Sequence, residues 1–280
     1  MHRNVVILGA GGRMGRAIAR GLMKRSVEGL RLFAAVERSD HPKQGQDIGI
    51  LSGTGLAEIS LTSDLDEYVS DIDVAIDFSY HEATAVHAQK LAKRGRPLVI
   101  GTTGLTMEET AQVEDAASQI AIVLAPNMSL GINLLLGLVK QAAISLKESG
   151  YDVEIIERHH RHKKDAPSGT ALGLGEAVAQ GLGVRLPDVA RYGRHEMTGE
   201  RTATEIGFHA IRGGDFVGDH TVLFATSGES IELSHRATSR DTFAMGALTA
   251  AAWICERPPG LYTMQDVLGL TAERAFSQPV

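Results

Sequence analysis

Residues 5–15 read Val5-Val6-Ile7-Leu8-Gly9-Ala10-Gly11-Gly12-Arg13-Met14-Gly15, an apolar run that passes directly into a glycine-rich turn. A continuous aliphatic run is typical of a strand that a parallel sheet buries on both faces. The glycines follow the spacing G-x-x-G-x-x-G, which permits a tight turn and lets backbone N–H groups approach a pyrophosphate at a helix N-terminus. The order of strand, glycine turn and helix predicts a dinucleotide-binding domain.

The remainder of the first 129 residues alternates short apolar runs with segments of helical period, the pattern of βαβ units. The expected strands are Val5–Leu8, Leu32–Val36, Val74–Phe78, Leu98–Ile100 and Ala121–Leu124. The expected helices are Met14–Lys24, His81–Lys93 and Met107–Ser118, and the last has the Thr106 and Glu109 spacing of a capping box. We therefore expect an α/β fold that begins with a Rossmann domain built on a mostly parallel sheet.

The pattern changes after Asn127, where a long helix is expected at Leu130–Lys147 with an apolar stripe of Leu130, Leu134, Leu138 and Ala142. Beyond it we expect strand Val153–Glu157, helix Gly169–Gln180, strands Ile206–Ile211, Thr221–Thr226 and Ile231–His235, and helix Thr242–Ile254. A two-residue turn, Gly228-Glu229, predicts a hairpin between the last two strands. These elements predict an α+β substrate-binding and oligomerisation domain at 130–239 with a mixed or antiparallel sheet. Residues 1–129 and 240–280 then form the dinucleotide-binding domain.

Composition restricts the class of protein. The net charge of −6 argues against a nucleic-acid partner, because phosphate contacts need a basic face. The single Cys255 excludes an internal disulfide and a cysteine-rich zinc module. The uncharged stretch 116–139 contains Pro126 and Asn127, so we expect a strand followed by a core helix there and no membrane span. The N-terminus leaves no room for an apolar signal core, and we expect a cytoplasmic protein.

An acidic residue closes the second expected strand. Glu37 lies 22 residues after Gly15 and can accept hydrogen bonds from the adenosine ribose hydroxyls, which favours NAD. Arg38 follows it and can clamp a 2′-phosphate, which favours NADP. The pair predicts use of both NADH and NADPH, and a solvated loop pair beside a plain turn is the alternative.

Other strand ends should meet the same crevice, because ligands bind at the carboxyl edge of such sheets. Gly101-Thr102-Thr103-Gly104 and Ala125-Pro126-Asn127-Met128 offer small residues, hydroxyls and an amide suited to a nicotinamide ring. Asp77-Phe78-Ser79 either borders this cleft or caps the helix near His81. The residues expected to bind the cofactor are Gly9, Ala10, Gly11, Gly12, Arg13, Met14, Glu37, Arg38, Gly101, Thr102, Thr103, Ala125, Pro126, Asn127 and Met128.

A charged run supplies the second signal. Arg158-His159-His160-Arg161-His162-Lys163-Lys164 holds three histidines and four other cations in seven positions, ahead of Asp165-Ala166-Pro167-Ser168-Gly169-Thr170. Histidines exchange protons near neutral pH, and the N–H groups of a helix start bind anions. The alternatives are a metal site, which the neighbouring cations would repel, a nucleic-acid patch, and a solvated surface run. We expect no metal and favour a site that binds a small multiply charged acid and delivers a proton.

The run from Glu154 to Ala171 closely resembles the signature of the 4-hydroxy-tetrahydrodipicolinate reductase (dihydrodipicolinate reductase) family. The likeness extends to the glycine turn at Gly9–Gly15, to Gly101–Gly104, to Ile206-Gly207-Phe208 with Arg212-Gly213-Gly214-Asp215, and to Glu232 through Phe243. It thus touches nearly the whole chain. The charged run is specific to this family, whereas a glycine turn alone is not.

The resemblance implies NAD(P)H-dependent reduction of 4-hydroxy-tetrahydrodipicolinate to tetrahydrodipicolinate, with loss of water, in the diaminopimelate pathway of lysine biosynthesis. It implies His159 as the acid/base residue and Lys163 as a proton donor, and the sequence leaves open which gives the decisive proton. It assigns His160 to substrate contact and Gly169 with Thr170 to binding a carboxylate of a small cyclic dicarboxylate. A homotetramer built through the sheet of the second domain is also implied.

Two other functions are compatible with a dinucleotide-binding domain. A related reductase, such as an aspartate or homoserine dehydrogenase, would act on another small anionic acid, and the charged run argues against it. A redox-sensing protein would use the dinucleotide only as a signal, and it would need a module for DNA or a partner that the sequence does not show. Turnover separates a sensor from an enzyme, because a sensor binds NADH without oxidising it.

Overall fold

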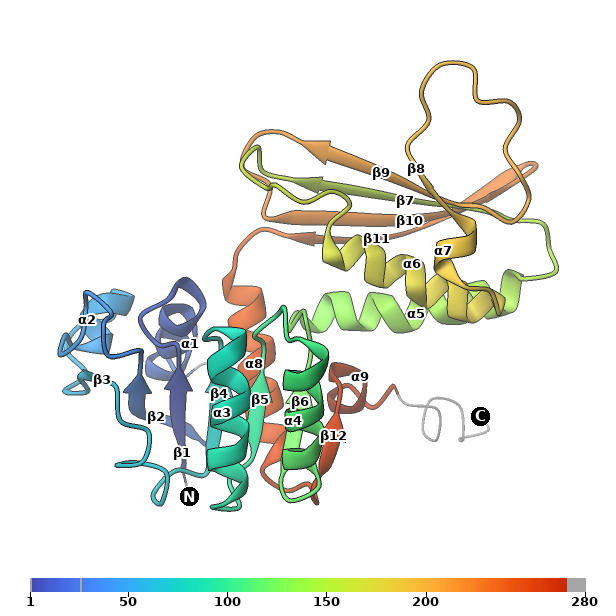
Figure 1. The fold of residues 1–280 in the computed structure, drawn as a ribbon. Helices are drawn as coiled ribbons and strands as arrows, with labels where there is room; N and C mark the ends of the chain where they lie inside the picture. Colours follow the sequence, from blue (N-terminus) through green and yellow to red (C-terminus); the bar gives the residue numbers. More distant parts are fainter. Residues whose placement is uncertain (1, 26, 271–280) are drawn as a thin grey trace. The chain divides into compact units, whose positions relative to one another are not determined.

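The computed structural model describes residues 2–25 and 27–270 (Figure 1). The chain divides into two compact units, one of Met1–Leu130 with Arg240–Val280 and one of Gly131–Ser239. The part of the expected first domain at 271–280 lies outside the described residues.

Unit 1 contains a seven-stranded sheet in the order β12-β6-β5-β4-β1-β2-β3, in which every pairing is parallel. Its strands are β1 (Arg3–Leu8), β2 (Leu30–Val36), β3 (Leu61–Thr62), β4 (Val74–Asp77), β5 (Leu98–Ile100), β6 (Ala121–Leu124) and β12 (Gly260–Tyr262). The strand order reverses between β1 and β4, so the switch point at which open α/β sheets bind ligands lies there. The prediction of a Rossmann fold is confirmed, and the short strands β3 and β12 were not predicted.

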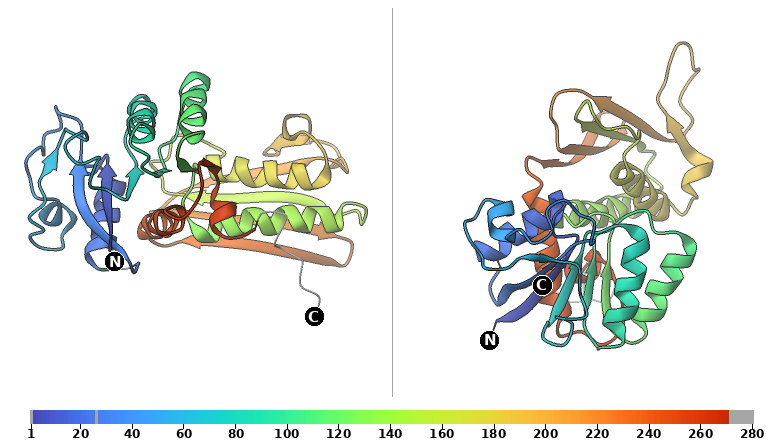
Figure 2. Two further views of the ribbon diagram at one scale, coloured as in Figure 1. Left: turned by 90° about the horizontal axis from the view of Figure 1, so that it is seen from below. Right: turned by 60° about the vertical axis from the view of Figure 1, so that its left-hand side comes forward.

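Helices cover both faces of this sheet. They are α1 (Arg13–Met23), α2 (Ile48–Ser52), α3 (His81–Ala92), α4 (Met107–Ala117), α8 (Asp241–Ile254) and α9 (Met264–Val267). Val5 and Ile7 of β1 enter one core cluster with residues of α1 and α8, while Val6 and Leu8 enter the other with residues of α3 and α4. Figure 2 (left) shows the teal and green helices α3 and α4 side by side. The capping box of Thr106 and Glu109 is confirmed.

Unit 2 contains a mixed five-stranded sheet in the order β11-β10-β7-β9-β8. Its elements are α5 (Leu130–Leu146), β7 (Asp152–His159), α6 (Gly169–Leu182), α7 (Leu186–Val189), β8 (Ala190–Tyr192), β9 (Ile206–Arg212), β10 (Gly218–Thr226) and β11 (Glu229–Ala237). Central β7 runs parallel to β9 and antiparallel to β10. Helices α5 and α6 cover one face of the sheet (Figure 1), where Val153, Ile155 and Phe224 join their core.

One local prediction was wrong, and the structure adds detail to another. Thr226 pairs with Glu229, so the hairpin turn is Ser227-Gly228 and not Gly228-Glu229. Gly228 has a φ of +93°, a conformation that glycine adopts without steric cost, which fixes it inside the turn. In α5, the predicted stripe is half exposed at Leu134 (44 %) and Leu138 (47 %), whereas Leu130 and Ala142 pack against core clusters.

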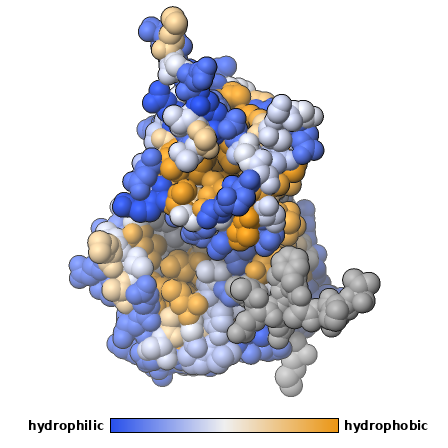
Figure 3. Space-filling view, turned by 90° about the vertical axis from the view of Figure 1, so that its right-hand side faces the viewer, coloured by the Kyte–Doolittle hydropathy of each residue, from blue (hydrophilic) through white to orange (hydrophobic). Residues whose placement is uncertain are grey.

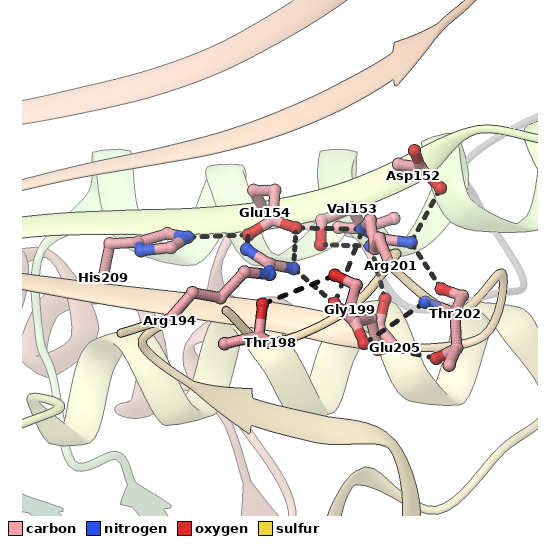
Figure 4. A network of polar contacts seen from close by, with 10 residues as sticks. All are labelled: Asp152, Val153, Glu154, Arg194, Thr198, Gly199, Arg201, Thr202, Glu205 and His209. Carbon is pink, nitrogen blue, oxygen red and sulfur yellow. Dashed lines mark hydrogen bonds and ion pairs between the residues drawn. The ribbon is translucent and has the colours of Figure 1, made fainter. Parts of the chain in front are cut away.

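A polar network anchors the segment between β8 and β9 to the sheet (Figure 4). Glu154 of β7 accepts hydrogen bonds from Arg194 (2.8 Å), Arg201 (3.0 Å) and His209 (2.7 Å). Burial opposes ionisation of Glu154, but these donors outweigh it and lower its pKa to about 2. Gly207 leaves room for the carboxylate, since a Cβ there would lie 1.8 Å from Glu154 Oε2. The carboxylate of Glu154 therefore ties a long connection to the central strand.

Glu154→Gln is expected to lower the free energy of unfolding at pH 7 by about 1–3 kcal/mol, the cost of losing hydrogen bonds to charged groups. A carboxyl whose folded pKa is depressed contributes stability above its unfolded pKa and loses it as pH falls through the folded value. The native chain should therefore lose this contribution between its ordinary 4.5 and about 2. Urea unfolding across that range measures the difference. Equal pH slopes in the variant and the native chain would contradict the assignment.

Candidate functional site

The glycine turn packs too closely for side chains. Gly9 has a φ of +79°, and a Cβ there would lie 2.4 Å from the carbonyl oxygen of Phe78, which follows β4. A Cβ at Gly15 would lie 2.3 Å from the Gly9 oxygen. Gly12 is exposed, and its Cβ would meet only that oxygen, at 3.3 Å. The backbone of the turn thus packs against the end of β4 at the switch point, and the start of α1 is accessible to a ligand.

A cavity of about 580 Å³ lies at the carboxyl ends of these strands. Its lining comes from the turn, from the ends of β4, β5 and β6, and from the first turn of α8. The residues are Gly12, Arg13, Met14, Phe78, Ser79, Tyr80, His81, Gly101, Thr102, Thr103, Pro126, Asn127, Met128 and Phe243. Gly101 lies against the Phe78 ring, because a Cβ there would come within 2.2 Å of it.

A second cavity of about 420 Å³ adjoins the first through shared lining residues. It is lined by Gly9, Gly12, Val36, Glu37, Arg38, His41, Ser63, Phe78, Ser79, Tyr80, Ala83 and His87. Glu37 Oε2 accepts a hydrogen bond of 2.9 Å from the Gly11 N–H. Arg38 Nε lies 3.4 Å from Asp40 on the exposed rim, so its guanidinium is held only loosely.

The structure brings most of the residues expected at the cofactor site to these two cavities. Ala10 and Ala125 line neither and are buried in the core of unit 1, while Gly11 is also buried and bonds Glu37. The lining residues that sequence reasoning missed are Val36, His41, Ser63, Tyr80, His81, Ala83, His87 and Phe243. Tyr80 and His81 directly follow a predicted strand end, and that position was the available signal. Phe243 lies far along the chain and gave none.

The sequence allows Asp77-Phe78-Ser79 two roles, and the structure supports the one in which this segment borders the cleft. The N-cap of α3 is Tyr80, and it makes no side-chain cap. Asp77 is fully buried and accepts hydrogen bonds from the Ser79 N–H at 2.8 Å and from His87 Nδ1 at 2.8 Å. Phe78 and Ser79 line both cavities. Asp77 therefore fixes the strand end that borders the cleft.

In unit 2 the charged run begins at the end of β7, where His159 is buried (8 % exposed) beside Glu157 (1 %). His159 Nδ1 lies 2.5 Å from Glu157 Oε2. Burial lowers the pKa of His159, and the Glu157 carboxylate offsets this only in part. Burial also opposes ionisation of Glu157, but hydrogen bonds from Arg212, His159 and Ser168 lower its pKa. Sequence reasoning assigned no role to Glu157 or Arg212.

The run then passes through Lys163, whose Nζ forms an ion pair of 2.9 Å with Asp165. Ser168 caps α6, and its Oγ accepts a hydrogen bond from the Ala171 N–H at 3.2 Å. Gly169 and Thr170 form the first turn of α6, and open space lies where a Cβ of Gly169 would stand. This part of unit 2 therefore collects a buried histidine, a lysine and an uncovered helix start.

Two further histidines lie beside these groups. The ring of His220 on β10 meets that of His159 edge to face at 5.1 Å, and its Nε2 lies 3.1 Å from Ser168 Oγ. Burial, helped by the neighbouring His159, lowers the pKa of His220 to about 4, so its ring is neutral at pH 7. The ring centroid of His160, the residue expected to contact substrate, lies 6.2 Å from that of His162, with the two rings tilted by 39°. His220 was not singled out in the sequence because it stands on a strand far from the charged run.

Residues 2–25 and 27–270 contain no group of three or more His, Cys, Asp or Glu side chains that could hold a metal ion. Across the same ranges, each helix is too short or too polar to cross a membrane.

Comparisons with known proteins cover almost the whole chain. Family models described as dihydrodipicolinate reductase, N-terminus and C-terminus, match residues 3–128 and 131–268. A 4-hydroxy-tetrahydrodipicolinate reductase of Anaeromyxobacter dehalogenans is 50 % identical over 95 % of this chain and 97 % of its own length. One from Nitrosomonas eutropha is 51 % identical over 95 % and 98 %.

Solved structures agree in fold. A dipicolinate-bound dihydrodipicolinate reductase from Paenisporosarcina sp. TG-14 aligns with a TM-score of 0.75 at 24 % identity, covering 95 % of this chain and 99 % of its own. An amine dehydrogenase from Mycobacterium smegmatis aligns with a TM-score of 0.60 at 15 % identity, over 94 % and 95 %. The two family models, the near full-length relatives and the Rossmann geometry agree, and the chain belongs to the dihydrodipicolinate reductase family.

Proposed function

We propose that the chain is an oxidoreductase that reduces 4-hydroxy-tetrahydrodipicolinate to tetrahydrodipicolinate with NADH or NADPH, releasing water, in the diaminopimelate pathway of lysine biosynthesis. The observation that carries this proposal is the 50 % identity with reductases of that name across 95 % of the chain. The two family models, at residues 3–128 and 131–268, include the glycine turn and the charged run.

The two cavities of unit 1 fit a dinucleotide. Gly9 and Gly15 hold the turn in a shape that no Cβ permits, which lets backbone N–H groups face the pyrophosphate. The cavity beside Glu37 and Arg38 suits the adenosine end, and the one lined by Thr102, Thr103 and Asn127 suits the nicotinamide. The bound cofactor supplies the hydride. The turn binds it, and the strand ends orient its ring.

Arg38→Ala is expected to weaken NADPH binding more than NADH binding. Arg38 lies on the exposed rim beside Glu37, so its guanidinium can turn toward a 2′-phosphate. Loss of a charge-assisted hydrogen bond costs about 1.5–3 kcal/mol, which is about tenfold or more in Kd. Titration of both cofactors against the variant and the native chain measures the ratio. Equal weakening of the two would remove the 2′-phosphate role.

The substrate we assign to unit 2 is a cyclic dicarboxylate, the class to which the dipicolinate bound by the Paenisporosarcina relative belongs. His159 acts as the acid/base residue, and Lys163 donates a proton and stabilises developing negative charge. His160 contacts the substrate. Gly169 and Thr170 bind one carboxylate through the N–H groups that begin α6.

We also propose a cytoplasmic homotetramer that assembles through the sheet of unit 2. Within the described residues, α5 and α6 cover only one face of this sheet (Figure 1). Ile211 (46 % exposed) on β9 lies on the other face and keeps apolar surface open there. Figure 3, seen from the right-hand side of Figure 1, shows apolar side chains gathered among hydrophilic ones but does not separate the two faces of this sheet. An exposed apolar surface of this kind favours association.

The deciding experiment follows NADH oxidation by absorbance in the presence of the freshly formed condensation product of pyruvate and aspartate semialdehyde. The expected result is rapid oxidation that depends on that product and on the chain. NADH binding without oxidation would reject the substrate and keep the dinucleotide-binding unit. The Gly15→Ala variant serves as the negative control. It retains the charged run but is expected to lose tight NADH binding.

A further inference from the structure

We propose that Glu157, clamped by Arg212, is a positioning residue that holds His159 with its proton on Nδ1 and presents Nε2 to the substrate. This proposal deepens the proposed function, on which it rests, by naming the groups that prepare the acid/base histidine. Neither Glu157 nor Arg212 was among the residues expected at the site.

The Glu157 carboxylate accepts four hydrogen bonds. Oε2 faces His159 Nδ1 at 2.5 Å and Arg212 Nη1 at 2.7 Å. Oε1 accepts from Arg212 Nη2 at 2.7 Å and from the Ser168 N–H at 3.0 Å. Only an ionised carboxylate accepts from four donors at once, and the paired bonds from Arg212 hold its plane fixed. The carboxylate is therefore both charged and immobile.

An ionised carboxylate can only accept, so the Nδ1 of His159 must donate. The neutral ring then carries its lone pair on Nε2, which is the nitrogen that takes up and returns a proton. Gly218 on β10 keeps that nitrogen uncovered, because a Cβ there would lie 3.0 Å from His159 Nε2. The arrangement matches the physical role of the aspartate in a Ser-His-Asp triad, which fixes tautomer and orientation without taking the proton.

The same pair connects three parts of unit 2. Arg212 at the end of β9 also donates to the Asp165 carbonyl at 2.7 Å, and Asp165 in turn pairs with Lys163. The Ser168 N–H reaches Glu157 from the start of α6. The Glu157 carboxylate thus connects the acid/base histidine, the proton-donating lysine and the carboxylate-binding turn through hydrogen bonds and ion pairs.

The charged and titratable groups that face His159 are Glu157 on its own strand, Arg212 on β9, His220 on β10 and Lys163 in the loop. The Glu157 carboxylate raises the pKa of His159, whereas burial, Lys163 and Arg212 lower it. Neutralising Glu157 should therefore lower this pKa further. If protonated His159 gives a proton in the reaction, activity is lost as pH rises. In a chain with a neutral residue at position 157, that loss should begin at a lower pH than in the native chain.

The test is Glu157→Gln, which keeps size but replaces a fixed acceptor by an amide. We expect kcat to fall by about 10²–10⁴-fold, the range for losing a correctly held acid/base histidine. KM and the Kd of NADH should change little, and the alkaline limb of kcat should move to lower pH. The strongly downfield proton resonance expected for His159 Nδ1–H should disappear.

Glu154→Gln is the matched control. Glu154 lies on the same strand with two arginines and a histidine as partners, but His159 is not among them. The Glu154→Gln variant should lose stability, but the pH profile of kcat and the downfield resonance should persist. Arg212→Lys keeps the charge without the paired bonds and should lower kcat by less than Glu157→Gln does. It also provides the measurement if Glu157→Gln does not fold.

A folded Glu157→Gln chain with native kcat, native pH profile and an unchanged downfield resonance would overturn the proposal. So would an equal shift of the pH profile in Glu154→Gln. The resonance is measured without substrate, so it tests the positioning of His159 independently of the proposed reaction. If the native chain shows the resonance but does not turn over the condensation product, the proposed function fails while the geometry stands.

Discussion

His159→Ala is expected to lower kcat by about 10²–10⁴-fold, the usual contribution of a positioned acid/base group. The side chain is buried at the end of β7, and its pKa lies below the ordinary histidine value. It belongs to unit 2, whereas the residues that line the two cofactor cavities all belong to unit 1. The Kd of NADH should therefore remain within about twofold of the native value. Steady-state kinetics and fluorescence titration of NADH measure the two quantities.

Lys163→Ala should give the same separation of turnover from cofactor binding, and comparing the two variants shows which group gives the decisive proton. His195→Ala is a suitable control, because this histidine is exposed and its nearest acid is 3.6 Å away. An equal loss of NADH affinity in the His159 and Lys163 variants would overturn their assignment to chemistry. Native turnover in either would remove that residue from the mechanism.

Gly15→Ala is expected to abolish tight NADH binding and to destabilise unit 1. Its Cβ would come within 2.3 Å of the Gly9 oxygen and 2.5 Å of Ala10 Cα. Both are backbone atoms, so the turn must shift. Overpacking of this kind costs about 1–3 kcal/mol, and each ~1.4 kcal/mol taken from binding is tenfold in Kd. Thermal unfolding and NADH titration give the two effects.

Gly12→Ala separates the fold of the turn from its surface. Gly12 is exposed, lines both cavities, and has only the Gly9 oxygen, at 3.3 Å, near the position of a Cβ. This variant should keep native stability while its methyl group weakens NADH binding. Native stability together with native NADH affinity in Gly15→Ala would show that the turn does not form the cofactor site.

The sequence predicted features whose residues are close neighbours in the chain. The glycine turn depends on the spacing of Gly9 and Gly15 after an apolar run, and Gly15 is fixed by its close approach to the Gly9 oxygen. The charged run likewise holds His159 and Lys163 in one short segment. Rossmann strands were found because their aliphatic runs are continuous, whereas β3 and β12 are too short to leave a pattern.

Features that depend on distant partners were missed. Glu157 stands at the start of the charged run, but its role follows from Arg212, which is 55 residues away and reaches it only through the parallel pairing of β7 and β9. His220 meets His159 because β10 lies antiparallel to β7. Neither pairing can be deduced from spacing along the chain.

The buried face of α5 could not be predicted for a different reason. This helix is apolar on nearly every side, so the period of its leucines does not single out a face. All four of Leu134, Leu135, Leu138 and Val139 are aliphatic. Leu135 and Val139 are buried, whereas Leu134 and Leu138 are about half exposed. The packing partners of the helix decide the face, and they lie on strands that come later in the chain.

The return of the chain to unit 1 sets an order of events during synthesis. Strand β12 pairs with β6, and α8 contributes Ala247, Leu248 and Ile254 to the core beneath β1. The sheet that begins with the third residue is therefore complete only after Tyr262 has left the ribosome. Unit 2 is contiguous over 131–239 and emerges whole before that moment. The part of the protein that is made first is thus the last to finish folding, and its apolar sheet face waits for α8 during translation.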